Sequence, residues 1–490
     1  MSTSAPPTPA APAAASDGRL GGRLTLVLLA MLWPAQMLTV AGVFTALTQA
    51  SVAQHFHTTQ IAWFTLVYSL VVTCVTPFVA RAGDLFGRRR IMLLILAAGV
   101  LGDLLVVMAP NYETMLVGRG IAGLYGPMAA LVYASARDVF PPRHVGLATG
   151  AIGSAAGIVL VACPLLGGWL LDHFGFKGAL WALTAGVALG FVLVLCFVPK
   201  IPPTETDVSF DWLGGILLGA SATAMIYAIG QGGTWGWTDA KLLGLLGLSV
   251  VLAVLFVLAE LRAAEPLLDV RMLARRDVAS VLVSTAVGQG AFFAAGTMIV
   301  FVALYPHIPG VSDGLGWTGT HNAVVGLPAG VLILLAGLAA GVLTRKTDPR
   351  IPWRVGLAVT ALGMVGQGFY HHNETQIIIF GCLTNLGAGL VLACAGILLL
   401  GVVSPKEQGV ASGMSIMLTN LVNTVAAQIM FSALNSDSRI LNGTSFYLDG
   451  ALRSAYFAMA ACVAFALLLS VFIPKVLRPD QIESGSATAA

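Results

Sequence analysis

Charged residues are scarce in this chain. Only 10% of its 490 residues are Asp, Glu, Lys or Arg, whereas 57% are hydrophobic; soluble domains carry about a quarter charged residues. A water-soluble fold cannot cover its surface with this mixture. The apolar runs reach the ~20 residues that a membrane-spanning helix needs, and their polarity does not alternate as in barrel strands. The sequence therefore predicts an all-α membrane protein embedded in the lipid bilayer.

The sequence lacks the residue patterns that disulfides, cysteine metal sites and ATP binding require. The six cysteines lie inside apolar runs without CxxC spacing, which is typical of small buried hydrophobes rather than disulfides or metal ligands. No GxxxxGK[ST] sequence is present to bind ATP. The net charge of +3 comes from basic residues beside the spans rather than from one patch, so we expect no nucleic-acid partner. We expect no cofactor either.

The adjacent histidines His371 and His372 suggest a metal site, but the sequence does not support one. All eight histidines fall in loops or at span ends, and no clear third ligand can be identified near this pair. We therefore expect a surface loop here and no metal. A membrane-embedded enzyme would need acids, histidines or a nucleophile–base pair inside the spans. Only Asp103 and Arg119 lie there, so an enzyme is the unfavoured alternative.

Fourteen apolar segments of membrane length can be placed between residues 24 and 473. The distribution of Lys and Arg tests this count. If the N-terminus is cytoplasmic, twenty basic residues fall on the cytoplasmic side and only Lys177, Lys241, Arg439 and Arg453 on the other, which is the bias that membrane insertion favours. One missed span would destroy it. The sequence thus predicts about 14 transmembrane helices, with both termini cytoplasmic, in the cell inner (plasma) membrane.

Polar linkers divide the spans into two sets of six with two between them. The expected units are a disordered cytoplasmic tail (1–23), an N-terminal six-helix bundle (24–200), a linker with two inserted helices (201–277), a C-terminal six-helix bundle (278–476) and a cytoplasmic tail (477–490). A weak repeat agrees, because a basic loop follows the second span of each bundle, at Arg88–Arg90 and at Arg345–Lys346. Repeated halves are typical of transporters, whose site lies near the bilayer midplane.

The loop after the second span reads Gly83-Asp84-Leu85-Phe86-Gly87-Arg88-Arg89-Arg90. It resembles the cytoplasmic signature of the major facilitator superfamily, G-x-L-x-D-R-x-G-R-R, with matches at Asp84, Gly87, Arg88 and Arg89 and departures at Ala80, Ala82 and Leu85. The resemblance implies the major facilitator fold. It also implies a conformational latch, in which Asp84 pairs with an arginine across the gap between the halves. The alternative is that the arginines only set the topology.

Other segments are similar to the fourteen-span drug:proton antiporter branch of this superfamily. The fourth span has an Arg119 motif, and the fifth resembles the close-packed antiporter motif ending GPxxGG, with matches at Gly150, Pro164, Gly167 and Gly168 and departures at Val159 and Cys163. Segments 210–215 and 230–237 are also similar. The resemblance implies a secondary active transporter that exports amphipathic or cationic small molecules by alternating access, with protons as the coupling ion. We expect a monomer. A uniporter, an importer or a lipid exporter of the same fold is the alternative.

The first span lacks the acid that this branch usually carries. Thr39 occupies its position, and Ala46-Leu47-Thr48 stands where Ala-Leu-Pro is usual. Any proton-coupling acid within the membrane must therefore lie in another span.

Asp103 and Arg119 are the charged residues inside the spans. Each lies eight residues from Asn111, where the third and fourth spans turn, so helical geometry places both about 12 Å from the turn. An acidic and a basic side chain at the same depth in the membrane should form an ion pair where the faces of their helices meet. Asp103 is then a candidate for the proton-coupling group. A static ion pair, or an Asp103 that is exposed and protonated in a thin outer layer, is the alternative.

Uncharged polar residues inside the spans are candidates for the substrate wall. They are Gln36, Gln289, Asn385, Asn420, Asn423 and Gln428. The alternative for each is a hydrogen bond between helices, which contributes about 0.6 kcal/mol in membranes.

Overall fold

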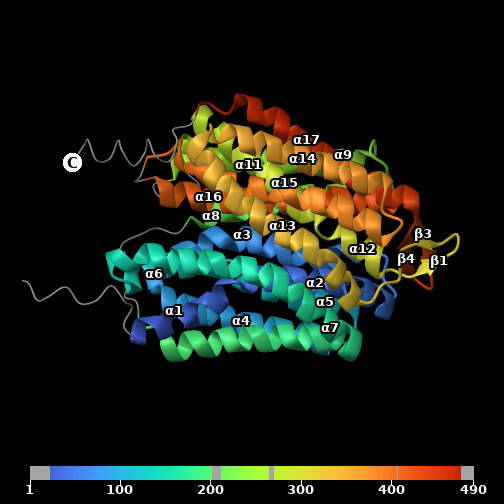
Figure 1. The fold of residues 1–490 in the computed structure, drawn as a ribbon, viewed down its shortest axis with the longest axis horizontal. Helices are drawn as coiled ribbons and strands as arrows, with labels where there is room; N and C mark the ends of the chain where they lie inside the picture. The colour runs from blue at the N-terminus through green and yellow to red at the C-terminus, as the bar shows by residue number, and fades with distance from the viewer. Residues whose placement is uncertain (1–21, 201–210, 264–269, 405–406, 476–490) are drawn as a thin grey trace, which may run out of the picture.

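The computed structural model describes residues 22–200, 211–263, 270–404 and 407–475. Within them two helical halves and an inserted helical pair run side by side (Figure 1). The predicted tails 1–23 and 477–490, and the linker over 201–210, lie almost wholly outside the described residues.

The N-terminal half reverses direction inside its longest helix. Its elements are α1 (Gly22–Ala35), α2 (Met37–His55), α3 (Ala62–Phe86), α4 (Arg88–Met108), α5 (Tyr112–Ala122), η1 (Gly123–Tyr125), α6 (Met128–Val139) and α7 (Pro142–Phe197). α1 with α2, and α5 with α6, form continuous spans. Gly175 has a φ of +67°, which only glycine adopts without strain. The chain folds back there, so α7 crosses the fold twice (Figure 1).

The inserted pair contacts both halves. It consists of α8 (Trp212–Trp235) and α9 (Ala240–Arg262), and the short α10 (Val270–Leu273) follows it. Asp211 and Asp239 begin the two long helices, because their carboxylates accept hydrogen bonds from the backbone N–H groups of Gly214 (2.8 Å) and Lys241 (2.7 Å). α8 packs on α9 and also contacts α3 and α16.

The C-terminal half adds two short hairpins to its helices. Its elements are α11 (Arg276–Ala295), α12 (Met298–Leu304), β1 (His307–Ile308), β2 (Ser312–Asp313), α13 (Gly319–Lys346), α14 (Arg350–Phe369), α15 (Glu374–Leu400), α16 (Gln408–Leu434), η2 (Asn435–Asp437), β3 (Ser438–Leu441), β4 (Thr444–Tyr447), α17 (Asp449–Leu469) and η3 (Ser470–Phe472). Both hairpins are antiparallel, with His307 opposite Asp313 and Ser438 opposite Tyr447.

The number of passes agrees with the prediction. Twelve helices in the described residues are long and apolar enough to cross a membrane. One of them, His144–Phe197, contains the reversal and crosses twice. In addition, α14 has 20 residues and packs against α15 and α17. Twelve helices, one extra pass and α14 account for fourteen passes, so this is a multi-pass membrane protein.

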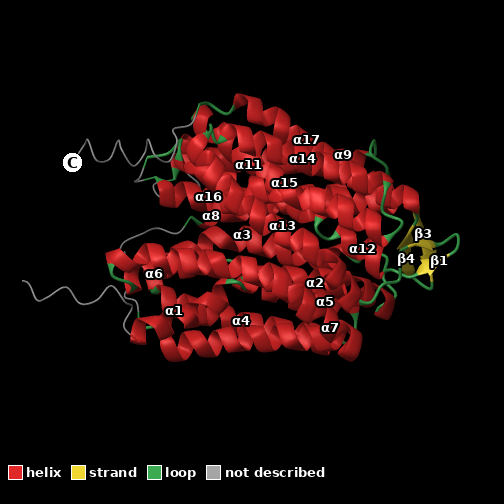
Figure 2. Cartoon of the chain, viewed as in Figure 1, coloured by secondary structure: helices red, strands yellow, loops and turns green. Residues whose placement is uncertain are grey.

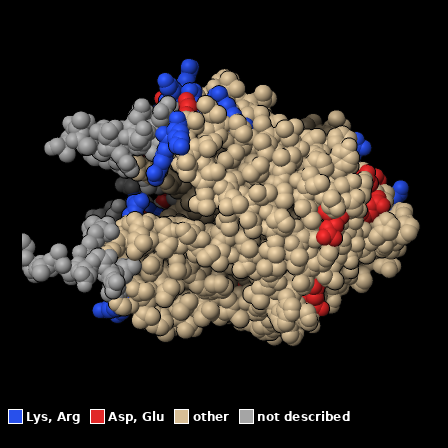
Figure 3. Space-filling model, in the orientation of Figure 1, with Lys and Arg blue, Asp and Glu red and all other residues tan. Residues whose placement is uncertain are grey.

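The two ends of the helix bundle differ in chemistry. Both hairpins lie at one end (Figure 2), which we name the hairpin end. The turn between α3 and α4, at Gly87, lies at the opposite end (Figure 1), and most of the Lys and Arg residues in view gather at that end (Figure 3). We name this the arginine end. Large apolar side chains such as Leu101, Leu338 and Leu362 are exposed along the sides between the two ends, as expected for surfaces that face lipid tails.

Apolar packing continues from one half into the other at the hairpin end. One buried cluster lies within the N-terminal half. The second fills the C-terminal half and extends to Val52 on α2, Ile61 just before α3 and Phe64 on α3. The halves therefore share a core at the hairpin end.

Candidate functional site

A carboxylate of the N-terminal half caps a helix of the C-terminal half. Asp172, close to the reversal of α7, accepts hydrogen bonds from the backbone N–H groups of Gly319 (2.6 Å) and Thr320 (2.8 Å) at the start of α13. Helix N-termini have unpaired N–H groups and a partial positive charge, so an acid there is stabilising. This contact holds the two halves together at the hairpin end.

Glycine packing brings the same two helices into backbone contact. A Cβ atom on Gly168 would lie 2.5 Å from the carbonyl carbon of Gly319. The β3–β4 hairpin adds a third contact, since Thr444 Oγ1 donates to the carbonyl of Ala53 in α2 (3.3 Å). Near its tip, Gly443 lies against His57. These contacts close the hairpin end.

The arginine end is hollowed between the halves. Figure 3 shows an opening between the two bodies at this end, beside the gathered Lys and Arg residues. The fold is thus closed at one end and open at the other. Two halves in such an arrangement are what alternating access requires.

A cavity of about 300 Å³ lies between the halves. Leu47 of α2 and Pro164 of α7 line it from the N-terminal half, and residues of α11 to α15 and α17 line it from the other half. Most of its wall is apolar. The polar side chains in the wall are Asn322, Gln367, Thr384, Asn385 and Tyr456. An apolar cavity with a few polar groups is typical of small-molecule sites.

Only one of the polar residues proposed for the substrate wall lines this cavity. Asn385 lines the cavity. Gln36 does not: it is buried, and its Nε2 donates to the carbonyl of Ile152 (3.0 Å), so it joins the junction of α1 and α2 to α7. Gln289, Asn420 and Asn423 are half-buried on α11 and α16, outside the lining of this cavity. Gln36 therefore has the alternative role, a hydrogen bond between helices.

The antiporter-like motif of α7 contributes close contacts toward the hairpin end. Pro164 lines the cavity. A Cβ on Gly167 would lie 2.7 Å from Leu47 Cδ1, and Gly168 touches Gly319. Gly150, in contrast, has no atom within 4 Å of its Cβ position. The end of the motif thus requires glycine for packing, whereas its beginning does not.

The Arg-rich loop ties the N-terminal half together in this state. Gly87 separates α3 from α4 with a φ of +90°. Asp84 Oδ1 accepts hydrogen bonds from Arg88 Nε (3.1 Å) and Nη2 (2.8 Å), and Arg88 Nη1 donates to the carbonyl of Ala134 (2.9 Å) and pairs with Asp138. Arg89 Nη2 donates to the carbonyl of Leu195 (2.7 Å). All these partners belong to the N-terminal half, so among the described residues Asp84 does not form the predicted pair across the gap in this conformation.

Arg119 is fully buried in the N-terminal half. Its Nη2 donates to Thr45 Oγ1 of α2 (2.6 Å) and its Nε to the carbonyl of Phe64 (3.2 Å). The guanidinium carbon lies 4.5 Å from the ring centroid of Tyr68 and 4.9 Å from that of Phe64. Hydrogen bonds and cation–π contacts therefore stabilise this charge inside the membrane.

The expected ion pair between Asp103 and Arg119 is not formed. Their helices pack as closely as predicted, since a Cβ on Gly102 would lie 2.8 Å from the carbonyl oxygen of Gly118. Arg119, however, points to α2 and α3. Asp103 is buried beside Tyr125, and it interacts with Arg119 only through longer-range electrostatics. Neither oxygen of Asp103 has a hydrogen-bond partner within the described residues. The alternative of an exposed Asp103 is also wrong, because its exposed fraction is 2%.

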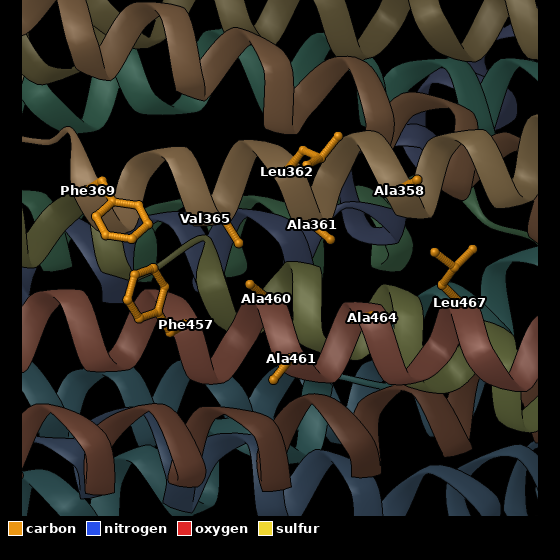
Figure 4. A pocket seen from close by; sticks show the side chains of 10 residues that line it. All are labelled: Ala358, Ala361, Leu362, Val365, Phe369, Phe457, Ala460, Ala461, Ala464 and Leu467. Atoms are coloured by element: carbon orange, nitrogen blue, oxygen red, sulfur yellow. The ribbon is translucent and has the colours of Figure 1, made fainter.

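A second hollow lies on the outer face of the C-terminal half. It is a groove of about 600 Å³ between α14 and α17, with Leu362, Phe369 and Phe457 along its sides (Figure 4). Its lining side chains are hydrocarbon throughout. Because it offers no polar side chain to orient a solute, the cavity between the halves is the better candidate for a transport site.

Residues 32–427 match the model of the Major Facilitator Superfamily. The match covers most of the chain, so this protein belongs to the Major Facilitator Superfamily and is a transporter rather than an enzyme.

Several curated relatives carry names of transporters. The chain is 26% identical over 376 residues to the multidrug resistance protein Stp of Mycobacterium tuberculosis, covering 76% of this chain and 68% of that protein. It is 25% identical over 408 residues to the tetracenomycin C resistance and export protein of Streptomyces glaucescens, covering 81% and 73%. An uncharacterized MFS-type transporter of Bacillus subtilis is 28% identical over 310 residues. The match spans 62% of this chain but only about half (56%) of that protein.

Solved structures share the fold at low identity. A peptide transporter of the POT family in an auto-inhibited form has a TM-score of 0.65 and 15% identity, covering 93% of this chain and 98% of that one. The human organic anion transporter TETRAN has a TM-score of 0.59 and 13% identity, covering 92% and 100%. These likenesses establish the architecture alone.

The residues that close the hairpin end are not among those predicted from the sequence. Asp172 follows the glycine pair of the motif at the end of a span, and the next half has a helix that begins at Gly319. Asp172 is an acid at the end of a span, and the first turn of α13 has no acid of its own. Together these two features are a weak signal for such a cap. Asn322, Gln367 and Tyr456 were missed because the sequence does not show which helix faces meet the cavity.

Proposed function

We propose that this transporter is a monomeric, proton-coupled exporter of amphipathic or cationic small molecules in the plasma membrane. The cavity between the halves carries the proposal, because its wall is apolar with a few polar groups and it belongs to a fold closed at one end only. The names of relatives concerned with multidrug resistance and with export of tetracenomycin C support an export role.

The distribution of basic residues supports the proposed orientation. Lys and Arg gather at the arginine end, and positive residues favour the cytoplasmic side. The open end then faces the cytoplasm, and we propose that the cavity receives its substrate from inside the cell in this state. Cysteines placed at the exposed positions His307 and Arg90 test this orientation. We expect an impermeant thiol reagent to label His307→Cys in intact cells and Arg90→Cys only after permeabilisation; the reverse would contradict the orientation.

Asp103 is the proposed proton-binding group. It is the buried acid of α4, and neither of its carboxylate oxygens has a hydrogen-bond partner within the described residues. Burying a charged carboxylate without partners is costly. If Asp103 takes up and releases a proton in each transport cycle, its carboxylate is charged, and therefore unfavourable to bury, in only part of the cycle.

Buried side chains link Asp103 to the cavity. The ring of Tyr125 lies against Gly99, one turn before Asp103, and its centroid is 5.9 Å from that of Tyr68. Tyr68 in turn stacks on Arg119. Arg119 holds Thr45 on α2, next to Ala46 and Leu47 in the cavity wall. Protonation of Asp103 would change the electrostatic field at Arg119. It would thereby shift the equilibrium between the positions that α2 can adopt.

Transport in reconstituted vesicles tests the proposal. The purified protein would be offered a panel of neutral, anionic and cationic amphipathic compounds, with and without a pH gradient. We expect accumulation of cationic or amphipathic members against their gradient, driven by the pH difference. Equilibration without accumulation would identify a uniporter. Movement of labelled phospholipids alone would identify a lipid exporter. Either result would contradict the proposal.

A further inference from the structure

Three side chains from distant parts of the C-terminal half meet at the hairpin end. His371 and His372 lie in the loop between α14 and α15, and Asp449 begins α17. The Asp449 carboxylate oxygen Oδ1 is 3.1 Å from His371 Nε2 and 3.6 Å from His372 Nδ1. The possible ligand atoms of all three lie within 4.8 Å of one another. The structure thus supplies the third group that the sequence did not reveal.

The buried histidine presents a lone pair to this cluster. His371 Nδ1 lies 2.8 Å from the carbonyl oxygen of Gln367, so this nitrogen carries the hydrogen and donates it. His371 Nε2 then faces the oxygen of Asp449 with a lone pair, and the two atoms do not align as a hydrogen bond. Two electron-rich atoms at this distance are stable when a cation lies between them.

We propose that His371, His372 and Asp449 form a binding site for a divalent transition-metal ion of the Zn²⁺ class. Tetrahedral zinc bonds imidazole nitrogen and carboxylate oxygen at about 2.0–2.2 Å, which separates the ligand atoms by about 3.4 Å. The separations from Asp449 Oδ1 fall on either side of this value. Imidazole ligands disfavour Mg²⁺ and Ca²⁺, which prefer oxygen.

Neighbouring groups hold the ligands as a metal site requires. The hydrogen bond from His371 Nδ1 to a backbone carbonyl fixes the ring orientation, as it does for most metal-bound histidines. The backbone N–H of Asp449 donates to Asp313 Oδ2 (2.8 Å), which anchors the start of α17. His371 is 2% exposed, whereas the side chains of His372 and Asp449 are 57% and 45% exposed. An ion can therefore enter from the surrounding solution and leave one coordination position to water.

The site lies directly behind the wall of the cavity between the halves. Gln367, which accepts the hydrogen bond from His371, has its side chain in the cavity lining and accepts from Thr384 Oγ1 (3.2 Å). The ring of Tyr456, also in the lining, lies 6.0 Å from that of His371. A bound ion would join the α14–α15 loop to the start of α17 and stiffen this part of the wall.

Metal binding by the purified full-length protein, with any affinity tag removed, tests the proposal. Zn²⁺ would be titrated in detergent by calorimetry and thermal melting. We expect saturation at one ion per chain and a higher melting temperature, with no such effect from Mg²⁺. His372→Ala and Asp449→Asn should each weaken the affinity about tenfold or more. His173→Ala, an exposed histidine of the N-terminal half, is the matched control and should bind like the parent.

Spectroscopy decides the identity of the ligands. X-ray absorption at the zinc edge should show imidazole scattering in the parent, reduced in His372→Ala. Since the two substituted side chains are half-exposed, both variants should fold, which size-exclusion chromatography would check. Absence of saturable Zn²⁺ binding by the parent would overturn the proposal. Equal affinity in Asp449→Asn, His372→Ala and the parent would overturn it too. Neither outcome depends on whether the protein exports drugs.

Discussion

Asp172 and Gly319 join the two halves of this transporter by a hydrogen bond of 2.6 Å between a carboxylate and a helix N-terminus. The residues are 147 positions apart, and the neighbouring N–H of Thr320 binds the second carboxylate oxygen. The proposed alternating-access cycle requires the hairpin end to open, so this contact would break once in each cycle. We therefore predict that Asp172 stabilises one of the two conformations relative to the other.

Replacement of Asp172 should weaken the closed hairpin end. Loss of a helix cap costs about 0.5–2 kcal/mol, so Asp172→Ala should shift the ratio of open to closed molecules about 2- to 30-fold toward opening. Spin labels at the exposed positions Lys177 and Glu374, one on each half, would report the distance across this end. We expect a larger population of long distances in the variant.

A cap of the same kind within the inserted pair provides the control. Asp239 accepts a hydrogen bond from the N–H of Lys241 at the start of α9, within the inserted pair. Asp239→Ala should leave the label distances unchanged. Equal distance distributions in Asp172→Ala and the parent would show that Asp172 does not set this balance.

A methyl group at Gly168 should also open the hairpin end. The added Cβ would lie 2.5 Å from the carbonyl carbon of Gly319 and 2.9 Å from the backbone nitrogen of Thr320. Backbone atoms cannot move aside as a flexible side chain can, so the halves must separate. Gly168→Ala should shift the same spin-label distances toward longer values. Gly150→Ala, where the methyl group meets nothing within 4 Å, should behave like the parent.

Asp84 should be required for transport but not for folding. In the present state its carboxylate holds Arg88 within the N-terminal half, and we predict that the Arg-rich loop forms a latch across the gap when the arginine end closes. Asp84→Asn removes the charge and keeps the shape, so it should lower the transport rate about tenfold or more with a near-parental melting temperature. Normal transport by this variant would mean that the arginines act only as topology signals.

The ion pair of Asp348 and Arg350 should give stability that depends on pH. Hydrogen bonds from Arg350 hold the pKa of Asp348 below its usual range. A carboxyl whose pKa is lowered by folding stabilises the protein fully above its unfolded value of about 3.9, and this contribution disappears as the pH falls through the lower folded value. Asp348→Asn should thus lower the stability by up to about 1 kcal/mol between pH 5 and 8.

The difference between parent and Asp348→Asn should shrink below about pH 4. Thermal melting in detergent across this range is the measurement. Arg350→Gln removes the same pair from the other side and should show the same dependence. A stability difference that stays constant to pH 3 would mean that the ion pair is not its cause.

The sequence predicted the passes well because hydropathy and positive charge are properties of whole segments. It also placed Asp103 and Arg119 at one depth, and the close approach of Gly102 to Gly118 agrees. It failed on their contact, because the direction of each side chain depends on how its helix is rotated. Arg119 faces α2 and α3, where Thr45 and Phe64 supply acceptors.

Contacts between distant residues were the hardest to predict. Asp172 with Gly319, and His371 with Asp449, each join separate helices whose neighbours are set by the packing of the whole fold. Gln36 illustrates the same difficulty, since a glutamine in a span can face a cavity or another helix. Hydropathy does not distinguish these two positions.

Substrate movement driven by a pH gradient, compared between the parent and Asp103→Asn, tests the central claim most directly. The measurement uses inverted vesicles and a cationic amphipathic dye that the parent transports. The parent should accumulate the dye against its gradient when the pH gradient is applied. Asp103→Asn should fail to accumulate it yet still exchange labelled for unlabelled dye, because exchange needs no net proton movement. Glu113→Gln, an exposed acid at the start of α5, should accumulate the dye like the parent. Full accumulation by Asp103→Asn would contradict the account.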